Sequence, residues 1–346
     1  MTLAFPCRFA IAIYGEDGAC LGVVAARRDW EPAHEWTRFY FQRRGRLSLD
    51  GNGSASSVIP LWDRTLGEPY CRGYRIQIET PDGMPPVASD FPNTHFREFA
   101  AELASRFVAQ RKLRAGELYS YALVAYPAPP EVAKAGGLSV TNASPGLPAR
   151  DASLADLLAR ATPSGVIDID DMPVFVSPRV LDEASELTRA EQGTETGGIL
   201  IGTLGRDTMA GDVFAEITAQ IPAEHTSGSQ VKLTFTPQTW AAADAALRLR
   251  KRGEIYLGYW HSHPVRAWCK TRACTLEAQK TCHLAKDFFS PDDEAVMRAA
   301  FPRAYSVAIV ANDTAFTDLT FSMFGNREGI TQPRGFYVLE ETIHGA

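Results

Sequence analysis

The sequence predicts an α/β (α+β) protein of two domains, with a smaller α+β domain before a mixed sheet flanked by helices. Three observations lead to this prediction. The chain has 346 residues, which is enough for two hydrophobic cores. A Pro- and Gly-rich stretch at residues 127–164 indicates a linker. Strand-like runs precede one long helix in residues 1–126, whereas strands and helices alternate in residues 165–346.

The first domain is predicted to contain short strands and one helix. A strand is expected at residues 118–126, and a helix over residues 95–112, where apolar residues from Phe96 to Phe107 recur at helical spacing. No catalytic combination of residues is visible here, so the expected role is to bind a partner or to position substrate. Four further apolar or alternating runs indicate strands, at residues 9–14, 20–26, 37–41 and 74–79.

The second domain is predicted from a regular order of elements. A short helix is expected near Ser153, within the linker. The remaining elements are a helix at residues 178–192, strands at 197–202, 213–220 and 231–236, a helix at 237–250, and a buried strand at 255–259.

Two histidines follow that last strand, in the run Trp260-His261-Ser262-His263-Pro264. Alternate residues of a strand point to the same side, so His261 and His263 can reach one ion. Neutral imidazole is the commonest zinc ligand, although many such pairs only pack in a core or lie on a surface. The pair alone therefore leaves the metal and the structural interpretations equally open.

Acidic residues downstream offer a third ligand. The run Ser290-Pro291-Asp292-Asp293-Glu294 is typical of a helix start, with Ser at the N-cap and Pro at N1. A helix start needs no metal, but a carboxylate in its first turn can still face inward. Asp293 is the expected ligand, and Asp287 and Asp292 are nearby alternatives.

Glu195 stands just before the apolar strand predicted at residues 197–202. A carboxylate in this place can act as a general base on a water molecule activated by a metal. The alternative interpretation is a solvated loop glutamate, which is the usual fate of a Glu that precedes a strand.

Together these three segments resemble the JAB/MPN metalloprotease family, also called JAMM. The family pattern is a Glu before a Gly-Gly-hydrophobic strand, then His-x-His-Pro, then Ser-x-x-Asp, and the resemblance spans about residues 165–340. It implies an MPN/JAB-like mixed sheet flanked by helices. It also implies one catalytic zinc on His261, His263 and Asp293, with Glu195 as general base and Ser290 helping to hold the oxyanion.

The same resemblance implies an activity and partners. It is that of a zinc-dependent isopeptidase or peptidase, which cleaves after the C-terminal tail of a ubiquitin-like protein. Bacterial deubiquitinase-like members occur beside ubiquitin-like, E1-like and E2-like proteins, and an antiphage conjugation system is one setting for them. Two alternatives are a non-catalytic MPN scaffold and a zinc hydrolase of a sulfur-carrier protein or a small amide.

The chain departs from the family pattern between Pro264 and Ser290, where an insertion of 25 residues, at 265–289, takes the place of a much shorter connection. We expect a loop beside the metal that grips an extended peptide tail, because it contains both aromatic and basic residues. A surface loop that only lengthens the connection is the alternative. Reduced packing cysteines are the first expectation in this segment, because no Cys-x-x-Cys pair occurs. A second, structural zinc is the alternative, held by Cys269, Cys274, Cys282 and His283.

Composition limits the remaining classes of function. The net charge of −6 and the pI of about 5.7 argue against a nucleic-acid-binding surface. No apolar stretch reaches membrane-spanning length, and Met1–Cys7 does not have the pattern of a signal peptide. Six cysteines without regular spacing are typical of a reducing compartment, so a cytoplasmic location is expected.

Overall fold

The computed structural model divides the chain into two compact units. Unit 1 comprises Met1–Gln42 and Arg46–Gly146, and unit 2 comprises Arg43–Gly45 and Leu147–Ala346. The predicted α/β class is confirmed at this level, because each unit combines helices with a separate sheet. The structure describes residues 3–4, 7–26, 30–50, 55–65, 67–80, 84–127, 146–191, 193–223, 235–281, 288–314 and 319–340.

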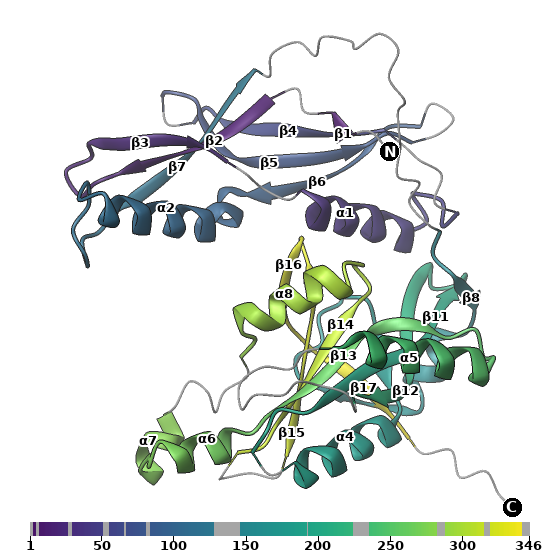
Figure 1. The fold of residues 1–346 in the computed structure, drawn as a ribbon. Helices are drawn as coiled ribbons and strands as arrows, with labels where there is room; N and C mark the ends of the chain where they lie inside the picture. Colours follow the sequence, from purple (N-terminus) through teal and green to yellow (C-terminus); the bar gives the residue numbers. More distant parts are fainter. Residues whose placement is uncertain are drawn as a thin grey trace, which may run out of the picture. The chain divides into compact units, whose positions relative to one another are not determined.

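Unit 1 is a seven-stranded sheet whose two longer helices lie on the same side of it (Figure 1). The strand order is β1-β4-β5-β7-β2-β3, with β6 paired to β5, and every pairing except that of β1 with β4 is antiparallel. The elements are β1 (Leu3–Ala4), β2 (Cys7–Tyr14), β3 (Cys20–Ala25), α1 (Glu31–Arg43), β4 (Ser56–Asp63), β5 (Tyr70–Ile78), β6 (Val87–Pro92), η2 (Asn93–Phe96), α2 (Arg97–Ala109) and β7 (Ser120–Pro127).

The core of unit 1 follows from two periodicities. Helix α2 buries Ala100, Leu103, Ala104 and Phe107, the spacing of one helical face. Strands β2 and β5 bury alternate residues against that face: Phe9, Ile11 and Ile13, and Tyr74, Ile76 and Ile78.

The strand predicted at residues 37–41 is wrong, because this segment belongs to helix α1. Aromatic residues favour strands in isolation, but here they recur at helical spacing. The Trp36 and Tyr40 rings stack with centroids 4.9 Å apart, and the hydroxyl of Thr37 donates to the carbonyl of Ala33. Glu31 in the first turn and Arg43 in the last suit the helix dipole. Strands β1, β4 and β6 were not predicted.

Unit 2 is built on a ten-stranded mixed sheet (Figure 1). The strand order is β16-β15-β14-β13-β11-β12-β10-β17-β9, with β8 paired to β11. The elements are β8 (Ala149–Asp151), α3 (Leu154–Leu158), β9 (Ala161–Ser164), β10 (Val174–Val176), α4 (Pro178–Ala190), β11 (Gly197–Asp207), β12 (Asp212–Pro222), α5 (Pro237–Arg250), β13 (Ile255–His263), α6 (Val265–Thr271), α7 (Leu276–Thr281), α8 (Pro291–Ala300), β14 (Val307–Asn312), β15 (Thr320–Arg327), β16 (Ile330–Arg334) and β17 (Phe336–Leu339).

The sheet of unit 2 has helices on both faces. One face packs on α5 and α8, because Tyr259 of β13 shares a core with Ala243 and Met297 of these helices. The other face packs on α4, where the indole of Trp260 donates to Gln220 and Gln220 donates to Glu183. Neighbouring residues of β13 therefore point to different layers.

Apart from Arg43–Gly45, unit 2 begins at Leu147, whereas the sequence predicted the second domain from residue 165. Residues 147–164, expected to be linker, contain β8, α3 and β9, and both strands pair within the ten-stranded sheet. These strands are only three and four residues long, too short for a periodic signal. The short helix expected near Ser153 is present, and the hydroxyl of Ser153 caps it.

The other predicted elements of unit 2 are observed, apart from the strand expected at 231–236. Residues 231–234 lie outside the described residues, and the two that are described, Phe235 and Thr236, are not in a strand, since Thr236 is the N-cap of α5. Helix α5 has the predicted bounds, and β11, β12 and β13 contain the predicted strands. Within the described ranges, no helix combines the length and apolar character that crossing a membrane requires.

Candidate metal centre

The two predicted histidine ligands lie at the end of β13, inside the sheet of unit 2. β13 pairs antiparallel with β11 and parallel with β14, so His261 lies between Gly197 and Val310. Both histidines are buried, with 1% and 2% of their surface exposed. As the sequence predicted, they share one face of the strand, and their rings point toward each other.

A glycine allows β13 to approach its neighbours this closely. Gly258 has φ of +147°, and a Cβ built on it would lie 1.7 Å from the carbonyl oxygen of Val307. No other residue fits this position without moving the strand. The register with β11 also shifts here, between Leu200 and Ile201. The histidine end of β13 therefore depends on a local irregularity three residues upstream.

Asp293 is supplied by the first turn of α8, as the sequence predicted. Ser290 is the N-cap: its hydroxyl accepts from the backbone amide of Asp293 at 3.1 Å, and the Asp293 carboxylate accepts from the amide of Ser290 at 2.8 Å. This reciprocal pair is a capping box. It fixes the Asp293 carboxylate relative to the start of the helix. Of the alternatives, Asp292 is exposed and Asp287 lies outside the described residues.

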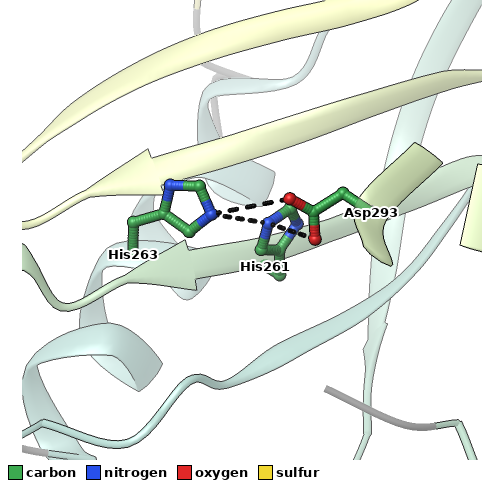
Figure 2. A group of neighbouring side chains, drawn as sticks. All are labelled: His261, His263 and Asp293. Carbon is green, nitrogen blue, oxygen red and sulfur yellow. Dashed lines mark hydrogen bonds and ion pairs between the residues drawn. The ribbon is translucent and has the colours of Figure 1, made fainter. Parts of the chain in front are cut away.

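The three side chains converge on one point (Figure 2). The Nε2 atoms of His261 and His263 are 3.0 Å apart. Oδ1 of Asp293 lies 3.2 Å from Nε2 of His261, and Oδ2 of Asp293 lies 3.8 Å from Nε2 of His263. Ligands about 2.0–2.1 Å from a tetrahedral zinc are separated by roughly 3.3 Å. Two imidazoles and one carboxylate at these separations fit a zinc ion that keeps a fourth position for another ligand.

Protonation of the cluster also suits a cation. Burial lowers the pKa of His263, and the neighbouring Asp293 only partly offsets this effect. The imidazole of His263 is therefore neutral near pH 7. Burial alone would raise the pKa of Asp293, but hydrogen bonds from His261 and His263 outweigh it and hold the pKa well below its usual range. Asp293 is therefore a carboxylate at neutral pH.

Glu195 is buried, with 7% of its surface exposed, so it is not a solvated loop residue. Gly197 lies opposite His261, and continuing this antiparallel register sets Glu195 opposite His263, on the same face. Burial raises the pKa of Tyr259, and the charges of Asp293 and Glu195 raise it further, which agrees with a Glu195 carboxylate on the cluster side of the sheet.

Ser262, between the two histidines, was not predicted to have a role. Its amide donates to the carbonyl of Thr196 at 2.8 Å, and its hydroxyl accepts from the amide of Thr196 at 3.0 Å. It is fully buried on the opposite face from the histidines. Ser262 therefore ties the segment that carries Glu195 to the strand that carries the ligands. The sequence did contain a signal for this role, because Ser262 is a polar residue between two histidines in a run predicted to be buried.

Aromatic residues of the insertion surround the histidines. The sequence predicted a loop with aromatic residues beside the metal, but not that their rings pack on the histidines. Phe288 stacks on His263 with ring centroids 4.3 Å apart, and Trp268 of α6 lies 5.6 Å from the same ring. Phe289 lies 6.2 Å from His261. The insertion thus contributes packing to the cluster at both of its ends.

The insertion is not the plain loop that the sequence predicted, because part of it forms α6 and α7. α6 starts directly after Pro264, so β13 leads into a helix. Of the residues proposed for a second zinc, Cys269 is buried and Cys274 is partly buried, while Cys282 and His283 lie outside the described residues. Among described residues, the only group of three potential ligands is His261, His263 and Asp293.

Comparison with known proteins gives three results. No curated protein matches the chain. One similar solved structure is the solution structure of protein DSY2949 from Desulfitobacterium hafniense, with 17% identity, a TM-score of 0.35, and coverage of 49% of this chain and 96% of that one. Residues 177–267 match the family model described as prokaryotic homologs of the JAB domain. The segment that carries Glu195, His261 and His263 is therefore similar to the prokaryotic JAB domain.

Proposed function

We propose that unit 2 is a zinc-dependent isopeptidase or peptidase that cleaves after the C-terminal tail of a ubiquitin-like protein. The observation that carries the proposal is the cluster of two buried histidines, His261 and His263, with the partly buried Asp293, and with Glu195 on the same side of the sheet. The match of residues 177–267 to the prokaryotic JAB domain supports it, since this domain family includes peptidases.

Each residue would have a separate task. His261, His263 and Asp293 would hold zinc, which, when bound, supplies a Lewis acid that polarises the scissile carbonyl and activates water. Glu195 would take a proton from the attacking water and pass it to the leaving amine. In the capping box the Ser290 hydroxyl oxygen only accepts a hydrogen bond. The cap therefore does not use the hydroxyl hydrogen, and the Ser290 hydroxyl would donate it to the oxyanion.

Burial supports this division of roles. A general base works best when its pKa lies near the operating pH and when water is excluded from the reacting groups. Glu195, His261 and His263 are all at least nine-tenths buried. The aromatic rings of Phe288 and Trp268 pack against His263 and limit the access of water to it. Unit 1 would bind the ubiquitin-like protein or an E1-like or E2-like partner.

Two other functions remain candidates. A non-catalytic scaffold would need no metal, yet all three ligands lie together. A zinc hydrolase of a sulfur-carrier protein or a small amide would use the same cluster with a different substrate. A cytoplasmic location and a role in antiphage conjugation stay predictions from the sequence.

The test uses the full chain loaded with zinc. The probe is the ubiquitin-like protein encoded nearest to its gene, carrying either a C-terminal reporter peptide or an isopeptide-linked lysine peptide. Mass spectrometry should find cleavage directly after the tail, and chelation of zinc should stop it. Cleavage that continues after zinc removal would overturn the mechanism. Zinc binding without cleavage of either probe would favour the scaffold or the small-substrate hydrolase.

A further inference from the structure

We propose that Tyr259 is a positioning residue that holds Asp293 against the two histidines. The inference rests on the metal site of the proposed function and adds to it a residue that supplies no ligand atom. Tyr259 lies two residues before His261 on β13, so both side chains share one face. It is 1% exposed, and its ring stacks on that of His261 with centroids 5.4 Å apart and 15° between the planes.

The same side chain contacts both ends of α8. Its hydroxyl donates to the backbone carbonyl of Asp293 at 3.1 Å, near the start of the helix. Its ring also stacks on Phe301, the C-cap residue, with centroids 5.7 Å apart and 14° between the planes. One residue of the ligand-bearing strand therefore fixes the place of the ligand-bearing helix.

A second contact of this kind is needed because the capping box acts only locally. Ser290 fixes the Asp293 carboxylate relative to the first turn of α8. It does not fix α8 relative to β13, and the distance between ligands depends on that. Tyr259 supplies this connection at the residue that carries the carboxylate. Polar groups just outside the ligand set commonly tune metal affinity in this way.

The chain contains a matched control on the same strand. Tyr256 is also a tyrosine of β13, and its hydroxyl donates to Asp244 of α5. Its ring packs edge-on against Trp240, with centroids 5.8 Å apart. Tyr256 thus connects the same strand to a helix, but α5 carries no ligand of the cluster. Removing either hydroxyl deletes one strand-to-helix hydrogen bond, and only one of these bonds ends at Asp293.

The experiment compares Tyr259→Phe and Tyr256→Phe with the wild type as full chains. Zinc affinity is measured by competition with a chromophoric chelator, and the ligand geometry is followed by the visible absorption of bound cobalt. We expect Tyr259→Phe to bind zinc about tenfold more weakly, with altered cobalt bands. Tyr256→Phe should stay within about twofold of wild type, because its hydrogen bond lies outside the ligand set. Equal zinc affinities and identical cobalt spectra in all three proteins would overturn the inference.

A double-variant cycle with Asp293→Ala separates positioning from a general loss of stability. If Tyr259 acts through Asp293, Tyr259→Phe should cause no further loss of zinc affinity in the Asp293→Ala background. Losses that simply add would show that the hydroxyl acts elsewhere. A wild-type protein that binds no zinc would overturn the proposed function together with this inference, whereas equal affinity in the wild type and Tyr259→Phe overturns this inference alone.

Discussion

His261 and His263 come from the middle of a sheet, whereas Asp293 comes from the first turn of a helix. Backbone pairing with β11 and β14 holds the histidines on both sides. Asp293 is held by individual contacts, namely the capping box with Ser290 and the hydrogen bond from Tyr259. The sheet therefore preorganises two ligands, while the position of the third depends on single side chains that can be replaced one at a time.

This difference has a consequence for mutations. Changes on β13 should remove a ligand but leave the sheet in place, because the backbone ladder does not depend on the side chains. Changes around α8 should shift the carboxylate and weaken the site by degrees. Variants on β13 should therefore have larger effects on zinc content than variants around α8.

His263→Ala should reduce zinc to near zero per chain and abolish cleavage, because two remaining ligands hold zinc poorly. Elemental analysis after dialysis measures the metal, and circular dichroism checks the fold. The zinc-free wild type is the control, and the variant should match its spectrum because pairing of β13 does not need the side chain. Full zinc occupancy in this variant would show that His263 is not a zinc ligand.

Glu195→Gln should lower the rate of cleavage by about 10²–10⁴-fold, the usual contribution of a positioned general base. Zinc content should stay at the wild-type level, since Glu195 is assigned no ligand role. Glu191→Gln is the matched control, because Glu191 is an exposed carboxylate close by in the sequence and should leave the rate unchanged. Zinc lost with the Glu195 carboxylate would show that it binds the metal instead.

Ser290→Ala tests the helix half of the site. Loss of an N-cap hydrogen bond typically costs about 1 kcal/mol of stability, and loss of an oxyanion donor lowers a rate by about 10²–10³-fold. Both effects are expected, together with a weaker zinc affinity. Thr236→Ala is the control, since Thr236 caps α5 through the same kind of bond. Equal effects of the two variants on cleavage would leave Ser290 with a capping role alone.

The insertion should give the smallest effect. Lys270 and Arg272 are exposed at the end of α6, the helix whose Trp268 packs against His263. If this helix meets an acidic substrate, replacing both by Glu should raise KM by roughly threefold to tenfold at low salt, with kcat unchanged. The same change at Lys251 and Arg252, exposed after α5, is the control. An unchanged KM would exclude this part of α6 from substrate binding.

Much of unit 2 could be predicted because its signals are local. The N-cap serine, the N1 proline and the acidic first turn predicted the start of α8, and strand periodicity put both histidines on one face. Residues 147–164 and 37–41 were misread for different reasons. Residues 147–164 contain strands that are too short to show a periodic pattern. In residues 37–41 the aromatic composition favoured a strand, although the aromatic residues recur at helical spacing.

The parts of the site that the sequence did not predict are those that depend on tertiary contacts. Nothing nearby in the sequence indicates that Tyr259 touches α8, so it was taken only as part of a buried strand. Trp268 was expected in a loop beside the metal, but its contact with His263 was not predicted. Ser262 shows its role only when Thr196 is placed beside it by pairing of distant strands. A single sequence thus revealed the candidate ligands, but not the residues that hold them in place.

Zinc content of the purified full chain tests the central claim most directly. The protein should be produced with zinc supplied, dialysed against buffer without chelator, and analysed for metal and protein in the same sample. The wild type should retain about one zinc per chain, as expected for two histidines and one carboxylate with a fourth position free. A folded protein that retains no zinc would contradict the metal centre and the peptidase activity proposed from it.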